Sequence, residues 1–431
     1  MTTGFGSRHG LLLAWVLLDG AVATYLGLYG SNVLSTLMLL AGVVVFGLAA
    51  VSGRPQGANL LGPSLGILAV LLVLAAVVPY RAESPPPPAA FRVFPLIGLV
   101  ALAVAFATQR SLTRGQAAWS WALWSVIGAG LAYRGAIVLL DIQLPFDVPL
   151  IQDAAGQAML QLQDPYMTRV YDSGYPYLPI SAIAAAVGVV FGDARWASVV
   201  GDVVTVLGVI LFARRVGAAP RLGLALAALA AWWSGGFYVT WQDFTEPIMI
   251  GFLVLGAAEL AAPTSRGISG GILLGLAAAT KQFGLGLLPF LPWRTQTGRR
   301  ALAAAIVTWL VVVVPFAVWH PPEFAEGAFL SHINEPGRAY ALNLLNWPGT
   351  HVEVPLLVVF PLALVFGLVC QRRQGGPIAA WLAGSAGFLL LAFALNKIAF
   401  VNYYMIPMTL ILLLILTLER QQVNADPLPG P

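Results

Sequence analysis

Apolar runs fill most of the chain and are separated by short polar segments. Five runs precede the first large polar segment, and each approaches the roughly 20 residues that a helix needs to cross a bilayer. They lie at residues 10–29, 32–51, 60–80, 91–108 and 117–140. Nine more runs follow, at residues 177–192, 196–213, 222–239, 247–262, 267–292, 301–319, 355–371, 377–394 and 400–418. The pattern predicts an all-α, polytopic membrane protein with about 11–14 transmembrane helices.

The first large polar segment runs from Asp141 to Pro179 and is dense in carboxylates and tyrosines. These are Asp141, Asp147, Asp153, Asp164, Asp172, Tyr166, Tyr171, Tyr175 and Tyr177. Within the segment, residues 146–163 place apolar side chains at helical spacing opposite a glutamine face, which predicts a helix lying in the membrane interface. Asp147 stands at the start of this helix, either as a helix cap or as a functional carboxylate. The tyrosines either contact a substrate or belong to an interfacial aromatic belt.

Arginines in the short loops predict the orientation, because cytoplasmic loops of membrane proteins carry an excess of positive charge. With Arg8 in the cytoplasm, five spans put the segment from Asp141 onward outside. Strict alternation beyond that point would also put a basic cluster outside, against the rule. That cluster consists of Arg214, Arg215 and Arg221.

Two irregular segments would remove this conflict. Residues 177–195 would enter the membrane and return on the outer side, and residues 267–292 would form two half-helices broken near Thr280–Gln282. Broken segments are tolerated where protein or a wet cavity covers the freed backbone groups. The alternative is that one short run is not a span. With the breaks, both termini are cytoplasmic, and the outer side gains loops 240–246, 320–354 and 395–399.

The composition fits a multi-pass protein of the cell membrane. Hydrophobic residues make up 59% of the chain and charged residues 9%, and the mean hydropathy is +0.84. No loop is long enough for a soluble domain of ordinary size. The arginines are scattered over short loops, which argues against nucleic-acid binding. Cys370 is the single cysteine and excludes an internal disulfide.

Lys281 is one of two lysines and lies inside a 26-residue apolar stretch. A buried ammonium group is costly unless it is paired, which marks the position as functional. Its partner is predicted to be a carboxylate or a phosphate entering from the lipid, unless the side chain snorkels to the interface. Arg338 could bind the same anion, and Arg134 in the fifth span is a third buried cation candidate.

Other candidates lie in the later outer loops. Asp243 and Glu246 follow Trp241 and Gln242 just before an apolar run, where acids either balance the helix dipole or line a cavity. Motifs for other chemistries are missing from the sequence: the four histidines have no ligand spacing, and no phosphate loop, dinucleotide fingerprint or nucleophile elbow occurs.

Six short motifs follow one another between residues 146 and 404. They are Phe146-Asp147-Val148 with its interfacial helix, Gln163-Asp164-Pro165-Tyr166, Tyr175 to Pro179, Trp241-Gln242-Asp243, Gly270 to Lys281, and Asn402-Tyr403-Tyr404. Their order resembles the GT-C class of integral-membrane glycosyltransferases, in particular mannosyltransferase-like members that use polyprenyl-phosphate sugars. The match runs over about residues 117–418. It implies a catalytic core at 117–431 with broken helices, beside an accessory group of four transmembrane helices at 1–116.

The resemblance implies that Asp147 is the general base, with Asp153 as the alternative. The reaction would move mannose, or another hexose or pentose, from a polyprenyl-phosphate donor to an extracytoplasmic glycan, lipid or protein acceptor. We expect Lys281 and Arg338 to bind the donor phosphate, and Asp243 and Glu246 to be supporting acids. The expected substrate pocket consists of Asp164, Tyr166, Tyr175, Tyr177, Trp241, Gln242, His332, Asn402, Tyr403 and Tyr404.

The chemistry of this reaction needs one carboxylate. Glycosidases use two because an alcohol leaving group takes up a proton, whereas a lipid phosphate leaves without one. One base for the acceptor hydroxyl and cations for the phosphate suffice, and in-line attack inverts the anomeric carbon. No cofactor is required, although a carboxylate pair could recruit a divalent metal. Two other classes stay open: a polytopic transporter or lipid-sugar flippase, and a non-catalytic scaffold for envelope assembly.

Overall fold

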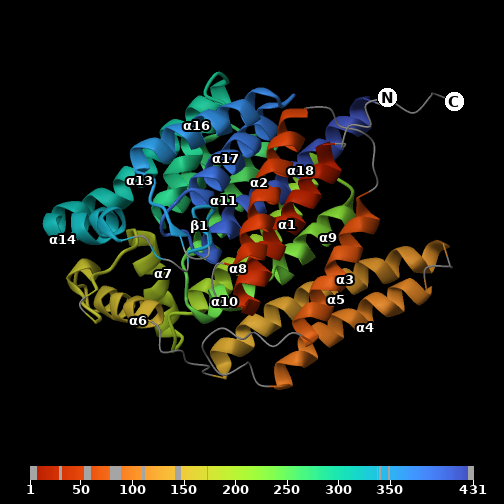
Figure 1. Ribbon diagram of the computed structural model, residues 1–431, viewed down its shortest axis with the longest axis horizontal. Helices are drawn as coiled ribbons and strands as arrows, with labels where there is room; N and C mark the ends of the chain where they lie inside the picture. The colour runs from red at the N-terminus through yellow and green to blue at the C-terminus, as the bar shows by residue number, and fades with distance from the viewer. Residues whose placement is uncertain are drawn as a thin grey trace. The chain divides into compact units, whose positions relative to one another are not determined.

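The computed structural model of the protein is almost entirely helical (Figure 1). It describes residues 7–28, 32–52, 60–77, 89–108, 112–140, 147–171, 173–336, 338, 341–347 and 350–425. The strands in these ranges are β1 (Asn346–Trp347) and β2 (Thr350–His351), which form one antiparallel pair. Asp141 and Asp172 lie outside the described residues. The helices pack into two compact units.

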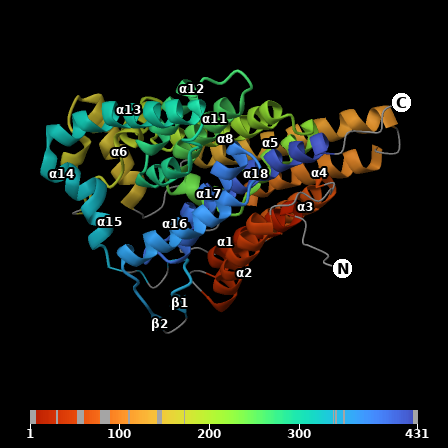
Figure 2. The ribbon, with the colours of Figure 1, turned by 90° about the horizontal axis from the view of Figure 1, so that it is seen from above.

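Unit 1 comprises residues 1–133, 209–235 and 337–431. Its helices are α1 (Ser7–Leu28), α2 (Val33–Ser52), α3 (Leu61–Val77), η1 (Ala89–Arg92), α4 (Val93–Thr108), α9 (Pro220–Trp232), α16 (Leu356–Arg372), α17 (Pro377–Ala394), η5 (Val401–Tyr404) and α18 (Met405–Ala425). α1 lies along α2 and α16 lies along α17 (Figures 1 and 2). The N-terminal helices also contact later ones, since α1 packs on α18 and α3 on α9. An accessory role for residues 1–116 stays a prediction.

Unit 2 comprises residues 134–208 and 236–336. Its helices are α6 (Asp147–Leu160), η2 (Pro165–Met167), α7 (Pro179–Val190), α10 (Gly236–Trp241), α11 (Glu246–Ala261), α12 (Ile268–Ala278), η3 (Gln282–Phe290), α13 (Gln296–Trp319), α14 (Pro321–Ala325), the π-helical η4 (Glu326–Leu330) and α15 (Ser331–Asn334). α5 (Leu112–Leu139) and α8 (Trp196–Val216) contribute residues to both units. Within unit 2, α6 lies along α7, and α12 packs against both α11 and α13.

Seven described segments are long and apolar enough to cross a membrane, judged by length and composition. They are Arg8–Gly27, Val33–Val51, Ala117–Leu139, Trp196–Val216, Gln296–Trp319, Pro377–Ala394 and Val401–Glu419. α13 also leaves a row of apolar side chains exposed, which is suited to lipid rather than to water. The row consists of Ile306, Val307, Leu310, Val311, Val314 and Val318. These features indicate an all-α, polytopic membrane protein, as the sequence predicted.

The apolar run at 222–239, predicted as one segment, is divided into α9 and α10, so this prediction was wrong. The chain leaves helical geometry between Trp233 and Gly235. Asp19 of α1 accepts hydrogen bonds from the backbone N–H and the hydroxyl of Ser234, each at 2.8 Å. The two glycines that follow weaken the helix further. The break therefore depends on a partner 215 residues away.

The predicted break in residues 267–292 is confirmed, because α12 ends at Ala278 and η3 begins at Gln282. The end of a helix leaves carbonyl groups without intrahelical partners. The N–H of Ile180 donates to the carbonyl of Ala279 at 3.1 Å. The N–H of Leu178 and the hydroxyl of Ser181 donate to the carbonyl of Thr280, at 3.3 Å and 2.7 Å. The start of α7 and the end of α12 thus satisfy each other's unpaired groups.

α7 has 12 residues, fewer than a span needs. This length agrees with the segment at 177–195 that was predicted to enter and leave on one side. Its path relative to a bilayer, and the helix count of 11–14, stay predictions.

Candidate functional site

α6 begins at Asp147, and its bounds agree with the helix predicted over residues 146–163. The Asp147 side chain is exposed and makes no hydrogen bond or ion pair with another described residue. Further along the helix, Ile151 and Ala155 are buried, and Gly156 lies directly against the backbone of Ala185 in α7. α6 is thus held along α7 while its first carboxylate stays accessible.

Asp164 and Tyr166 fold the loop that follows α6. One carboxylate oxygen of Asp164 accepts from the N–H of Tyr166 at 3.0 Å, and the other lies 2.7 Å from Nδ1 of His320. The Tyr166 hydroxyl donates to the carbonyl of Tyr177 at 2.7 Å. Asp164 and Tyr166 are both buried. Both side chains are therefore engaged in shaping the loop, and their predicted contact with substrate stays a prediction.

Tyr175 lies at the centre of a buried aromatic group, with its ring edge-on to those of Tyr166 and Tyr177 at 5.6 Å. Its hydroxyl donates to Oε1 of Gln152 in α6 at 3.1 Å. Burial raises the pKa of the Tyr175 hydroxyl well above its usual value, and the charge of Asp243 adds to this. The hydroxyl therefore remains a hydrogen-bond donor at neutral pH.

Lys281 lies in the break between α12 and η3, where its ammonium group is paired with Glu246 of α11 at 2.5 Å. Both side chains are buried, and the ammonium also lies over the rings of Tyr177 and Phe283, at 5.3 Å and 5.4 Å. The structure thus identifies a carboxylate as the partner of the buried Lys281. A contact with donor phosphate, which would require Glu246 to share the ammonium group, stays a prediction.

The turn from α10 to α11 holds Asp243 in an unusual backbone conformation. The N–H groups of Asp243 and Phe244 donate to the carbonyls of Thr240 and Val239, at 3.3 Å and 3.1 Å. This bond pattern closes a helix with one left-handed residue, usually glycine. Asp243 takes that place with a φ of 52°. Few residues with a side chain adopt this conformation, and Asp is among those that do.

α8 holds this turn with side chains one helical turn apart. The hydroxyl of Ser198 lies 3.0 Å from Oδ1 of Asp243 and 2.9 Å from the carbonyl of Phe244, so it shares one proton between two acceptors. The hydroxyl of Thr240 lies 3.3 Å from Asp202. Asp202 also pairs with Arg134 at 2.7 Å. The buried cation predicted at Arg134 therefore supports the α10–α11 turn.

Three side-chain atoms of this turn are buried without a hydrogen-bond partner among the described residues. They are Nε2 of Gln242, Oδ2 of Asp243 and Oγ1 of Thr245. Thr245 is the N-cap residue of α11, yet its hydroxyl makes no capping bond. A buried polar group left unsatisfied costs about 1–3 kcal/mol. Three such atoms within four residues are a concentration that calls for a polar ligand or bound water.

Asp193 and Arg195, which were not among the residues predicted from the sequence, form a charged pair near this turn. Asp193 accepts from Nε of Arg195 at 2.9 Å. Burial raises the pKa of Asp243 to about 7, against the hydrogen bond from Ser198, and the charges of Asp193 and Asp153 contribute. Burial likewise raises the pKa of Asp153. In the sequence, an acid and a base two positions apart in the short link after an apolar run were the signal that could have identified this pair.

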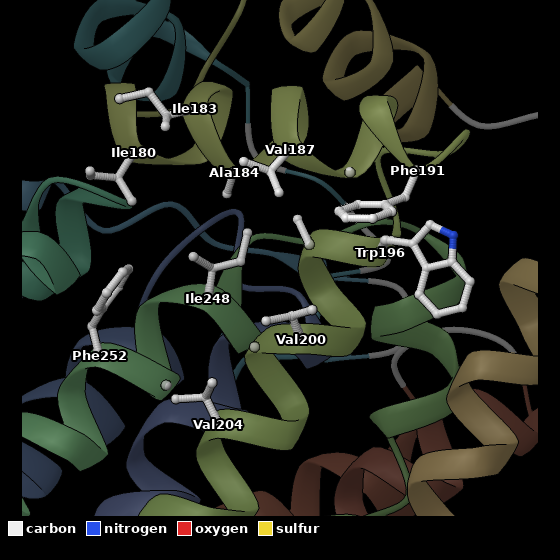
Figure 3. Close-up of a pocket in the computed structure, with 14 residues that line it drawn as sticks. Ile180, Ile183, Ala184, Val187, Phe191, Trp196, Val200, Val204, Ile248 and Phe252 are labelled. Atoms are coloured by element: carbon white, nitrogen blue, oxygen red, sulfur yellow. The ribbon is translucent and has the colours of Figure 1, made fainter.

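An apolar cavity of about 300 Å³ opens between α7, α8 and α11 (Figure 3). Its lining is almost entirely hydrocarbon and includes Ile180, Val187, Phe191, Trp196, Val200, Ile248 and Phe252. Trp196 follows Arg195 directly in the chain, and Ile248 lies two residues after Glu246. In the sequence, the polar residues Arg195 and Glu246 therefore stand close to residues that line the cavity, at the starts of α8 and α11.

Four predicted residues belong to unit 1. The guanidinium group of Arg338 lies 5.5 Å from the ring of Phe400. Asn402, Tyr403 and Tyr404 are buried, and the Tyr404 hydroxyl donates to a backbone carbonyl in the loop after Arg338, at 2.6 Å. Their grouping with Asp147 stays a prediction.

Two other predicted side chains are placed as follows. Trp241 ends α10 and is buried, with its ring 5.2 Å from that of Phe237. His332 lies in α15, but its side chain is outside the described part of the structure.

Across the described ranges, no three His, Cys, Asp or Glu side chains gather closely enough to hold a metal ion. Comparison of the chain with protein-family models, with curated proteins and with solved structures finds no match.

Proposed function

We propose that the protein is a membrane glycosyltransferase that moves a sugar from a polyprenyl-phosphate donor to an acceptor hydroxyl outside the cytoplasm. The observation that carries the proposal is the combination, within unit 2, of an exposed carboxylate on α6 and an apolar cavity bordered by α7. A lipid-linked donor needs apolar surface for its chain, and the transfer needs a base. The order of the sequence motifs, which resembles the GT-C class, supports the same reaction.

The cavity suits a segment of hydrocarbon chain. Its volume of about 300 Å³ lies at the lower limit for small-molecule sites, so it would hold part of a polyprenyl chain while the remainder lies in the bilayer. A wall without polar groups cannot form hydrogen bonds with a hydrated solute. This favours a lipid-linked donor over a nucleotide-linked one.

Asp147 is the base in this proposal. Its carboxylate takes the proton of the acceptor hydroxyl while that oxygen attacks the anomeric carbon. The bond between the anomeric carbon and the phosphate oxygen breaks, and its electron pair stays on the phosphate. The products are the inverted glycoside, the lipid phosphate and a protonated Asp147. Among the candidate acids of unit 2, Asp147 has the most accessible carboxylate, because Asp164, Asp243 and Glu246 are buried.

The proposal is tested by sugar transfer from a radiolabelled polyprenyl-phosphate donor. Asp147→Asn removes the base and is expected to lower turnover by about 10²–10⁴-fold, with unchanged thermal stability because the side chain is exposed. Glu323→Gln, the same chemical change elsewhere in unit 2, serves as the control and keeps wild-type turnover.

If Asp147→Asn retains turnover and Asp153→Asn loses it, Asp153 is the general base and Asp147 is not. Absence of turnover in the wild-type protein with hexose and pentose donors would contradict the proposed function itself.

A further inference from the structure

We infer that the α10–α11 turn binds the sugar ring of a substrate through the side chains of Gln242, Asp243 and Thr245. The inference deepens the proposed function and rests on it for the reaction in which the sugar takes part. The kind of ligand follows from the chemistry of the turn.

The three buried atoms offer both kinds of hydrogen-bonding group. Nε2 of Gln242 can only donate, Oδ2 of an ionised Asp243 can only accept, and Oγ1 of Thr245 can do either. None has a partner among the described residues. Gln242 is 1% exposed, Asp243 2% and Thr245 0%, so ordinary solvation does not satisfy them.

This mixture discriminates between classes of ligand. A metal cation needs acceptors, and the amide N–H of Gln242 would face it with the wrong polarity. A phosphate needs donors, and Asp243 would repel it when ionised, which it is above a pH of about 7. Vicinal hydroxyl groups donate and accept at neighbouring positions, so a sugar satisfies all three side chains together.

The backbone of the turn is built for the same purpose. Asp243 occupies a left-handed position where glycine is the unstrained choice. Thr245 forgoes the capping bond that an N-cap threonine normally makes. Ser198 holds Asp243 from α8. These departures leave three buried polar atoms of the turn without a hydrogen-bond partner among the described residues.

The turn also directly precedes residues that belong to the other two features of unit 2. Thr245 directly precedes Glu246, the partner of Lys281, and Ile248 in the first turn of α11 lines the apolar cavity. A lipid-linked sugar with its chain along the cavity would therefore bring its polar end to the start of α11.

The test is direct binding of free sugars to the purified full-length chain in a detergent without a sugar head group. Thermal unfolding is followed with mannose, glucose, galactose and arabinose at up to about 100 mM, because a bound ligand raises the unfolding temperature. Inorganic phosphate and Mg²⁺ are run at matched ionic strength. We expect a saturable rise with at least one sugar and none with phosphate or Mg²⁺.

Two near-isosteric variants remove single polar groups, Thr245→Val and Gln242→Met. Each is expected to weaken sugar binding by about 3- to 10-fold, with an unfolding temperature equal to or above that of the wild type without sugar. Thr205→Val is the matched control, because Oγ1 of Thr205 on α8 is also buried without a partner among the described residues.

The inference is overturned if none of the sugars raises the unfolding temperature. It is also overturned if the wild type, Thr245→Val and Gln242→Met bind sugar with equal affinity. Either result leaves bound water as the partner of these groups. Sugar binding without turnover would contradict only the proposed function. Turnover that is unchanged in both variants would contradict only the sugar subsite.

Discussion

At the scale of single residues, Asp243 links backbone strain, burial and charge in one side chain. Its left-handed backbone holds the carboxyl group inside the protein, and burial raises its pKa from 3.8 to about 7. The folded protein therefore binds this proton over a pH range in which the unfolded chain has released it. By proton linkage, this residue makes the folded state less stable as the pH rises from about 4 to about 7.

The variant Asp243→Asn is expected to flatten that pH dependence. Between pH 5 and pH 8 the unfolding temperature of the wild-type protein should fall more than that of Asp243→Asn, since the amide does not ionise. Thermal unfolding at fixed ionic strength measures both curves, and Asp147→Asn, which changes an exposed acid, should keep the wild-type slope. Identical slopes in wild type and Asp243→Asn would show that Asp243 is ionised throughout.

At the scale of helices, small residues allow unit 2 to bring backbones together. A Cβ at Gly201 of α8 would lie 2.5 Å from the carbonyl carbon of Pro247 and 2.6 Å from the backbone nitrogen of Ile248. Backbone atoms cannot move aside as a flexible side chain can. Gly201 also lines the apolar cavity, so this close approach of α8 and α11 sets one of its walls.

Gly201→Ala is therefore expected to force α8 and α11 apart. The expected cost is about 1–3 kcal/mol, observed as a lower unfolding temperature in one detergent. Gly128→Ala in α5 is the control, because a Cβ there meets nothing within 4 Å, and alanine raises helix propensity by up to about 1 kcal/mol. Equal unfolding temperatures for Gly201→Ala and the wild type would mean that the helices do not meet at this point.

At the scale of the whole molecule, the seven candidate spans indicate a membrane-embedded chain, while the orientation rests on the positive-inside rule. The predicted topology places the loop after α6 outside and the start of α13 in the cytoplasm. Cys370 is the single cysteine and is buried. Replacing it gives a background in which one introduced thiol reports the side of the membrane.

In a Cys370→Ala background, Leu162→Cys should react with a membrane-impermeant maleimide on intact cells. Gln296→Cys should react only after the cells are permeabilised. Both positions are exposed, so a difference in labelling reports sidedness rather than burial. The reverse pattern would place the proposed site on the cytoplasmic side.

The sequence alone determined the helical elements and the positions where chemistry is concentrated. Apolar runs, and the apolar periodicity of residues 146–163, are local properties, so they predicted α6 and most of the other helices within a few residues. The cost of placing an ammonium group in hydrocarbon is also local. This cost identified Lys281 as a candidate functional position. The structure confirms a break between α12 and η3 at this residue.

Only the tertiary structure decided which groups meet. Lys281 pairs with Glu246 across 35 residues, and Asp243 is held by Ser198 across 45. Which helix faces touch depends on packing over the whole chain and leaves no periodic signal in either partner. The division of residues 222–239 by Asp19 and the unsatisfied atoms of the α10–α11 turn have the same origin, because burial is a property of the assembled fold.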